Sequence, residues 1–175
     1  MGGGLIAPPI YGKKDNYPFQ PKTDKKSATK KEKGEIFSMV HFFIPMKIPT
    51  ATHQEKQVRV IHGKPCFYEP TNVKDARQKY LAYLGKYVPE QKLEGAISLT
   101  VKFVFCDERM ASAYRWKTTK PDTDNMIKLV KDCMTKLGYW HDDAQVCREL
   151  VEKFYSRDVE GIYIELEAMD TERND

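Results

Sequence analysis

The sequence predicts an α+β fold: a single domain with a mixed or antiparallel sheet and two main helices packed on one face. Three observations predict the domain. Its 175 residues suit one domain. Segments of strand and helix character alternate from Met39 onward. Hydrophobic residues make up 41% of the chain, enough for a core.

The first 36 residues are expected to form a disordered basic extension, because they are rich in Gly, Pro, Lys, Asp and Ser. Residues 1–38 hold eight lysines and four acidic residues, which account for the whole net charge of +4. Two interpretations stay open: a basic arm that grips phosphates, or a passive extension. The folded domain is expected over residues 39–170.

The first half of that domain shows four elements. A short apolar strand covers 40–46, and residues 57–68 form a hairpin that turns at His62 and Gly63. Residues 72–87 have apolar residues at helical spacing, with Asn72 as the expected cap. In 96–105, alternate residues are apolar, which predicts a strand with one buried face.

The second half continues with a helix over 125–137, where a continuous apolar stripe ends at Gly138. Two further strands, 145–155 and 161–169, are expected to pair with each other. No window approaches the roughly 18 consecutive apolar residues of a membrane span, and the N-terminus lacks a secretory signal pattern. None of the four cysteines forms a CxxC pair, so we expect reduced thiols in a cytoplasmic protein.

Two acidic pairs bracket the second helix. Asp122 and Asp124 are two residues apart in an expected extended segment, so their carboxylates should point to the same side. Asp124 is the expected helix N-cap, and Lys128 follows one turn later. Asp142 and Asp143 come between the helix and the next strand. Each pair alone is more typical of a cap or a solvated turn. Taken together with Lys128, the two pairs leave a catalytic and a structural interpretation equally open.

Clustered carboxylates repel one another unless a cation neutralises them. Oxygen ligands without cysteine or a dominant histidine suit Mg²⁺, with Mn²⁺ as an alternative, better than zinc. A metal held in this way polarises a phosphate and activates a water, and a nearby lysine neutralises developing charge. These residue types therefore fit phosphodiester hydrolysis, with no organic cofactor.

The stretch KPDTDNMIKLVKDCM, followed by DDAQV and then Lys153, resembles the RusA family of Holliday junction resolvases. The resemblance covers roughly residues 39–168 and implies that three aspartates bind metal and a lysine assists. Carried onto this chain, the expected catalytic residues are Asp122, Asp124, Asp143 and Lys128, the aspartates being the metal ligands. Secondary or second-shell roles are expected for Asn125, Asp132, Asp142 and Gln145.

A basic and aromatic stretch precedes this motif. We expect four of its residues to contact DNA: Arg109, Arg115, Lys117 and Lys120. They are interleaved with Tyr114 and Trp116, which suits phosphate contact and stacking on opened bases. An ordinary long loop is the alternative interpretation for any one of these residues.

The leading hypothesis is a metal-dependent, structure-selective endonuclease that resolves four-way DNA junctions, as in recombination, repair and prophage biology. Two symmetric nicks imply a twofold homodimer with two active sites. Two alternatives remain: an accessory protein that binds branched DNA without cutting it, and a nuclease of flaps or forks with the same chemistry.

Overall fold

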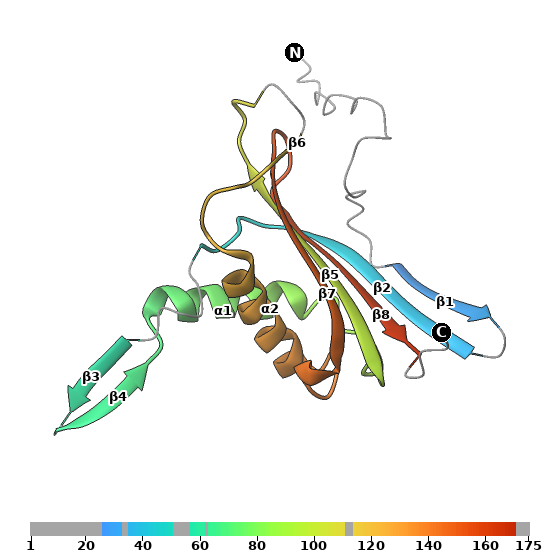
Figure 1. Ribbon diagram of the computed structural model, residues 1–175, viewed down its shortest axis with the longest axis horizontal. Coiled ribbons are helices and arrows are strands. Elements are labelled where there is room, and N and C mark those ends of the chain that lie inside the picture. Colours follow the sequence, from blue (N-terminus) through green and yellow to red (C-terminus); the bar gives the residue numbers. More distant parts are fainter. Residues whose placement is uncertain (1–25, 33–34, 51–56, 62, 111–113, 171–175) are drawn as a thin grey trace, which may run out of the picture.

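The computed structural model describes residues 26–32, 35–50, 57–61, 63–110 and 114–170. Its main element is a six-stranded sheet in the order β1-β2-β8-β5-β7-β6 (Figure 1). The strands are β1 Lys26–Glu32, β2 Glu35–Pro45, β5 Ala96–Cys106, β6 Tyr114–Trp116, β7 Val146–Ser156 and β8 Gly161–Met169. Strands β5 and β7 are parallel and all other neighbours are antiparallel, so the expected mixed sheet is confirmed.

Two helices, α1 (Thr71–Leu84) and α2 (Thr123–Leu137), lie on one face of this sheet, as expected (Figure 1). In β5, Ile97, Leu99, Val101 and Phe103 are buried against them, and residues between these are less buried. Apolar residues of both helices complete the core, including Tyr80 and Leu129. The period-two and helical patterns thus identified the buried faces correctly.

The helix ends differ from the sequence expectation. Helix α1 has Pro70 rather than Asn72 at its N-cap. Helix α2 begins at Thr123, with Asp122 at the N-cap and Asp124 in the first turn. The expected extended segment with Asp124 as cap is therefore wrong: Pro121 restricts only the residue before it, and the helix starts two residues beyond. Gly138 ends α2 in the left-handed conformation, as predicted.

The expected disordered extension is wrong in its last part. Residues Lys26–Glu32 form β1, which pairs with β2 from Glu35 onward. Composition missed this edge strand because a lysine-rich edge strand looks like a polar tail. Residues 1–25 lie outside the described residues, so the expectation for them stays a prediction.

Strands β7 and β8 were expected to pair, and the structure corrects this. Strand β5 lies between them, parallel to β7 and antiparallel to β8. Gly161, the first residue of β8, stands opposite Pro45 and Val104, and a Cβ there would collide with the carbonyl oxygen of Ile44. Local turn signals cannot reveal a strand inserted from earlier in the chain.

The predicted hairpin is confirmed as β3 (Gln57–Ile61) and β4 (Lys64–Tyr68), with Ile61 opposite Lys64 and Gly63 at positive φ. It projects away from the main sheet (Figure 1). His62 lies outside the described residues. No described helix is long and apolar enough to span a membrane.

Strand β7 is incompletely paired on its outer side. Strand β6 covers only Phe154–Ser156, with one further backbone bond from Lys117 N to Lys153 O at 3.1 Å. Before that point no described strand pairs with the outer edge, and Cys147–Leu150 are all exposed. An unpaired edge of this kind is a template for another strand.

Candidate active site

The N-terminal end of α2 presents the first acidic pair. Asp122 and Asp124 are exposed, and neither side chain forms a hydrogen bond or ion pair with a described residue. Asp122 holds the N-cap position without capping the helix through its side chain. The partial positive charge of a helix N-terminus favours anions at this place. Both carboxylates are therefore available to a ligand.

The loop that leads to Asp122 is held by Lys153 of β7. Its Nζ donates to the carbonyl oxygen of Thr119 at 2.9 Å and to that of Pro121 at 2.7 Å. Sequence reasoning noted Lys153 as part of the motif but gave it no role. The sequence did contain a signal for such a role. Lys153 lies on the same face of β7 as Val151 and Tyr155, which pack against the core, and an apolar residue is normal at such a position.

A second lysine completes the anchoring. Lys117 is only 8% exposed, and its Nζ donates to Thr119 Oγ1 at 2.6 Å and to Tyr155 Oη at 2.9 Å. Its ammonium also lies 4.9 Å from the Phe105 ring centroid and 4.8 Å from that of Tyr155. Hydrogen bonds from Lys117 and Thr119 lower the pKa of Tyr155. Because this ammonium is engaged inside the protein, nothing in its geometry favours the expected phosphate contact.

The polar face of α2 carries Lys128, Lys131 and Asp132. Lys128 is exposed and has no ion pair with a described residue. Lys131 pairs with Glu149 at 2.7 Å. Asp132 lies 3.8 Å from Arg77, which Glu69 also binds. Asp132 was expected as a secondary site residue, and one ion-pair partner of its carboxylate is Arg77 of α1.

The second acidic pair lies past the other end of α2. Asp142 caps the 3₁₀ turn Asp143–Gln145, accepting from Ala144 N at 2.8 Å. Gln145 accepts from the backbone of His141 at 2.8 Å and of Asp142 at 3.2 Å, and it also donates to the carbonyls of Leu93 and Gly95. Asp143 is exposed, and its side chain has no described partner. Gln145 therefore shapes the backbone around Asp143.

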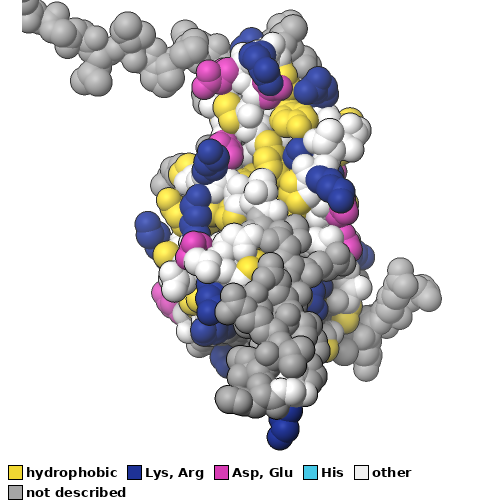
Figure 2. Space-filling model, turned by 90° about the vertical axis from the view of Figure 1, so that its left-hand side faces the viewer, with side chains coloured by type: hydrophobic (Ala, Val, Ile, Leu, Met, Phe, Trp, Pro, Cys, Tyr) yellow, Lys and Arg dark blue, Asp and Glu magenta, His cyan; other side chains and the backbone are white. Residues whose placement is uncertain are grey.

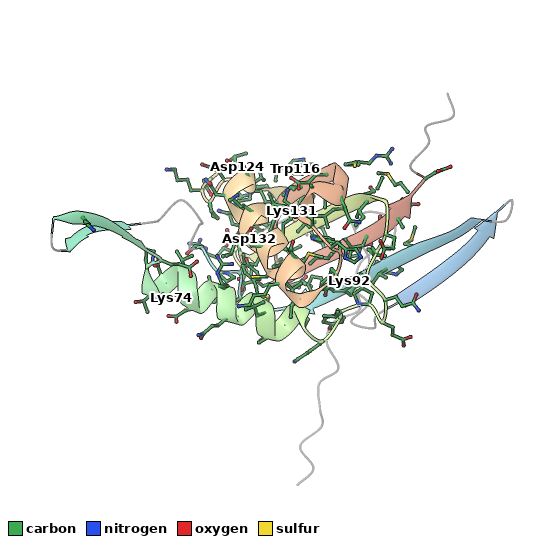
Figure 3. All side chains as sticks on the ribbon, turned by 90° about the horizontal axis from the view of Figure 1, so that it is seen from below. Lys74, Lys92, Trp116, Asp124, Lys131 and Asp132 are labelled. Carbon is green, nitrogen blue, oxygen red and sulfur yellow. The ribbon has the colours of Figure 1, made fainter. Side chains whose placement is uncertain are left out.

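The two acidic pairs do not meet within one chain. Helix α2 has 15 residues, so its ends are about 22 Å apart. Strand β7 runs beside it in the opposite direction, since Lys153 contacts Pro121 whereas Glu149 pairs with Lys131. Figure 3 labels Asp124 at one end of α2 and Lys92, beside Gly138, toward the other.

In agreement with this separation, no three His, Cys, Asp or Glu side chains of the described residues form a group that could hold a metal ion. The carboxylate oxygens are of the kind that Mg²⁺ binds. A single chain nevertheless offers them as separate groups: Asp122 with Asp124, and Asp143 by itself. Asn125 stands beside the first group, half-exposed and without a described hydrogen bond.

The basic residues expected at DNA lie around β6 and its loops. Arg109 and Lys120 are exposed, as is Arg115, whose guanidinium is 5.0 Å from the Tyr155 ring centroid. Arg109 and Arg115 share Asp107, and hydrogen bonding by Arg109 lowers the pKa of that carboxyl. Trp116 is 60% exposed, and its ring packs against that of Phe154 in a tilted arrangement, with the ring centroids 4.4 Å apart. Figure 2 shows basic and acidic side chains mixed on the helix-covered side.

Two comparisons with known proteins bear on this arrangement. Residues 45–167 match the family model described as endodeoxyribonuclease RusA. The chain is 35% identical over 102 residues to a crossover junction endodeoxyribonuclease of Lactococcus phage r1t, covering 57% of this chain and 76% of the relative. It is 32% identical over 108 residues to the uncharacterised protein YqaN of Bacillus subtilis, covering 55% of this chain and 75% of that protein.

Proposed function

The chain belongs to the RusA family of endodeoxyribonucleases, and we propose that it resolves four-way DNA junctions by metal-dependent phosphodiester hydrolysis as a homodimer. The observation that carries the proposal is the set of exposed carboxylates without described partners, Asp122, Asp124 and Asp143, at the motif positions of the family. We assign them as metal ligands and Lys128 as the assisting cation.

A bound Mg²⁺ would polarise the phosphate as a Lewis acid and would make a bound water easier to deprotonate. The protein's own contribution is to place charge around the scissile phosphate. Lys128 is exposed on the turn after Asp124, where its ammonium can neutralise charge that develops on the phosphate oxygens. In this proposal Arg109, Arg115 and Lys120, which are exposed, bind neighbouring phosphates.

A second copy of the chain supplies the missing third carboxylate in this proposal. If two β7 edges pair antiparallel around a twofold axis, the beginning of one strand lies beside the end of the other. Asp143 of the partner subunit then lies toward the loop that Lys153 holds, next to Asp122 and Asp124.

The first test is cleavage of a labelled synthetic four-way junction with Mg²⁺ or with a chelator. We expect paired symmetric nicks that need the metal. Tight binding without nicks would instead support the accessory-protein alternative. Preferred cutting of flaps or forks over the four-way junction would support the second alternative.

The second test is complementation between two inactive variants, Asp122→Asn and Asp143→Asn. A mixed dimer of these variants has one site with both substitutions and one site with neither, so co-expression should restore single nicks. The matched control mixes Asp122→Asn with Asp124→Asn, which leaves a defect in both sites. Equal restoration in both mixtures, or in neither, would contradict a site shared between subunits.

A further inference from the structure

We propose that Lys153 is a positioning residue of the active site, whose ammonium fixes the backbone of Thr119–Pro121 and thereby the place of the Asp122 carboxylate. This inference rests on the proposed function, because it assigns a role at the same site. The inference goes beyond the proposed function because it names a residue, Lys153, that acts on the loop and not on the phosphate. Lys117 supports the same loop.

The contacts of Lys153 join a rigid element to the loop. Lys153 lies in β7 opposite Phe103 of β5, in the interior of the sheet. From there its Nζ reaches two carbonyl oxygens, of Thr119 at 2.9 Å and of Pro121 at 2.7 Å. Asp122 is the next residue after Pro121. The metal-ligand position is thus one peptide unit away from a charge-assisted hydrogen bond to the sheet.

The loop needs this support because its backbone has few other bonds. Between β6 and α2, the described residues form two backbone–backbone hydrogen bonds outside the regular elements: Lys117 N donates to Lys153 O, and Met126 N donates to Asp122 O. The Asp122 side chain does not cap the helix. Without Lys153, the carbonyls of Thr119 and Pro121 have no described donor, so the approach to Asp122 can shift.

Lys117 holds the same loop through a side chain. Thr119 Oγ1 accepts from Lys117 at 2.6 Å and lies 3.1 Å from Tyr155 Oη. Thr119 is therefore held twice, through its carbonyl by Lys153 and through its hydroxyl by Lys117. Both lysines point their ammonium groups at the protein's own oxygens. Neither has a carboxylate of the described residues at ion-pair distance, so neutral oxygens of the loop and of Tyr155 are the hydrogen-bond acceptors of both ammonium groups.

A lysine at position 153 is distinguishable from a phosphate anchor. An ammonium has three donors, and two of those on Lys153 are used by carbonyls that approach within hydrogen-bonding distance. If Lys153 bound a phosphate of the DNA, removing its charge would weaken the affinity of the protein for the junction. A positioning residue should instead affect metal binding and the chemical step, with the affinity for the junction nearly unchanged.

The experiment compares full-length wild type with Lys153→Met, Lys153→Arg and Thr119→Val, and uses Lys102→Met as the matched control. Lys102 also sits in the sheet and pairs with a β7 residue, Glu152, at 3.1 Å, but on the face away from the helices. Four quantities are measured: amide hydrogen exchange of residues 117–124, Mn²⁺ affinity by calorimetry, junction affinity with metal absent, and the single-turnover cleavage rate.

We expect Lys153→Met to speed exchange in the 117–124 segment and to weaken Mn²⁺ binding and cleavage by about 10- to 100-fold, the usual effect of removing a group that orients a metal ligand. Lys153→Arg, which keeps charge and donors, should recover part of each loss. Thr119→Val should reproduce the faster exchange in milder form. Junction affinity should stay near wild type, and Lys102→Met should lower thermal stability only.

Unchanged exchange and Mn²⁺ affinity in a folded Lys153→Met would overturn the proposal, and so would a loss confined to junction affinity. If the wild type cut no branched DNA, the proposed function would fail. The exchange and Mn²⁺ measurements would still decide whether Lys153 positions Asp122.

Discussion

The two ends of α2 carry similar acidic pairs in the sequence and use them differently in the structure. At the N-terminal end, Asp122 stands at the cap position without a capping bond, and Asp124 has no described partner. At the other end, Asp142 accepts from Ala144 N at 2.8 Å and completes a capping box with Gln145. Only Asp143 of the second pair is left without a described partner.

This difference separates structural from chemical carboxylates. A side chain whose acceptor is used by the nearby backbone stabilises a turn, whereas an exposed, unpartnered carboxylate at a helix N-terminus is open to a cation. The N-terminal pair also has a lysine network behind it, with Lys153 and Lys117 bound to the loop. By this criterion we propose Asp122, Asp124 and Asp143 as residues of the site, and Asp142 as a residue that stabilises the turn.

The largest expected effect on cleavage comes from comparing separate substitutions of the two aspartates in the second acidic pair. Asp143→Asn should reduce cleavage by at least about 100-fold, as loss of a charged group acting on the transition state does, with junction binding kept. Asp142→Asn should leave cleavage close to wild type, because asparagine is also a good N-cap. Cleavage rates on a saturating junction are the measurement. A larger loss in Asp142→Asn than in Asp143→Asn would reverse the assignment.

The two lysines of the α2 polar face give the next comparison. Lys128→Ala should slow single-turnover cleavage by about 100-fold and weaken junction binding much less. Lys131→Ala, one turn further along, should remove only the ion pair with Glu149, which for a partly exposed pair contributes about 1 kcal/mol or less. A loss of affinity alone in Lys128→Ala would make that residue a phosphate anchor.

Much of the fold followed from local patterns, and the departures have physical causes. Alternation in β5 and the apolar stripe of α2 identified their buried faces because both elements pack on a single core. The strand order could not be predicted in the same way. Strand β5 separates β7 from β8, and this order depends on packing between segments that are far apart in the sequence. Strand β1 was missed because lysines on an edge strand resemble those of a tail.

The residue types of the candidate site could be predicted from the sequence, but the separate role of each residue could not. The motif spacing singled out both acidic pairs and Lys128. It did not reveal that Lys117 is buried against Phe105 and Tyr155, since a lysine between Trp116 and Thr118 looks solvated. Nor could it tell which aspartate caps a turn, because that depends on backbone donors such as Ala144 N.

The proposed dimer is tested at Leu150, which is 48% exposed on the unpaired part of β7. Leu150→Asp should disfavour edge-to-edge pairing, because the substitution puts a charged side chain on the unpaired edge of each subunit. Light scattering should then report the 20.3 kDa chain mass, against about twice that for wild type, and Mg²⁺-dependent nicking should fall with it. A Leu150→Asp monomer that cuts normally would place the complete site within one chain.

A smaller effect is expected at Trp116, one of two tryptophans in the chain. Trp140 is fully buried and donates to Thr135 Oγ1 at 2.7 Å, so changes in emission on DNA binding report chiefly on Trp116. Stacking on an opened base should quench this emission and contribute about 1–3 kcal/mol to binding. Trp116→Phe should remove the quenching and keep most of the affinity. Equal quenching by a duplex and by a junction would argue against contact with opened bases.

The smallest effect concerns the cysteines, which report on the same interface without a change in activity. Cys147 is exposed on the unpaired part of β7, Cys106 is exposed at the end of β5, and Cys133 is buried in α2, where desolvation raises its pKa to about 11. In a Cys66→Ser background, pairing of two β7 edges should slow alkylation of Cys147 in the dimer relative to the Leu150→Asp variant. Cys106 should react equally in both proteins, because it lies at the opposite end of the strand register. Cys133 should stay unreactive at neutral pH, since its thiolate is scarce and covered. Protection of Cys106 in place of Cys147 would move the interface to the β6 end of the sheet, where Asp143 of the partner subunit could not reach Asp122.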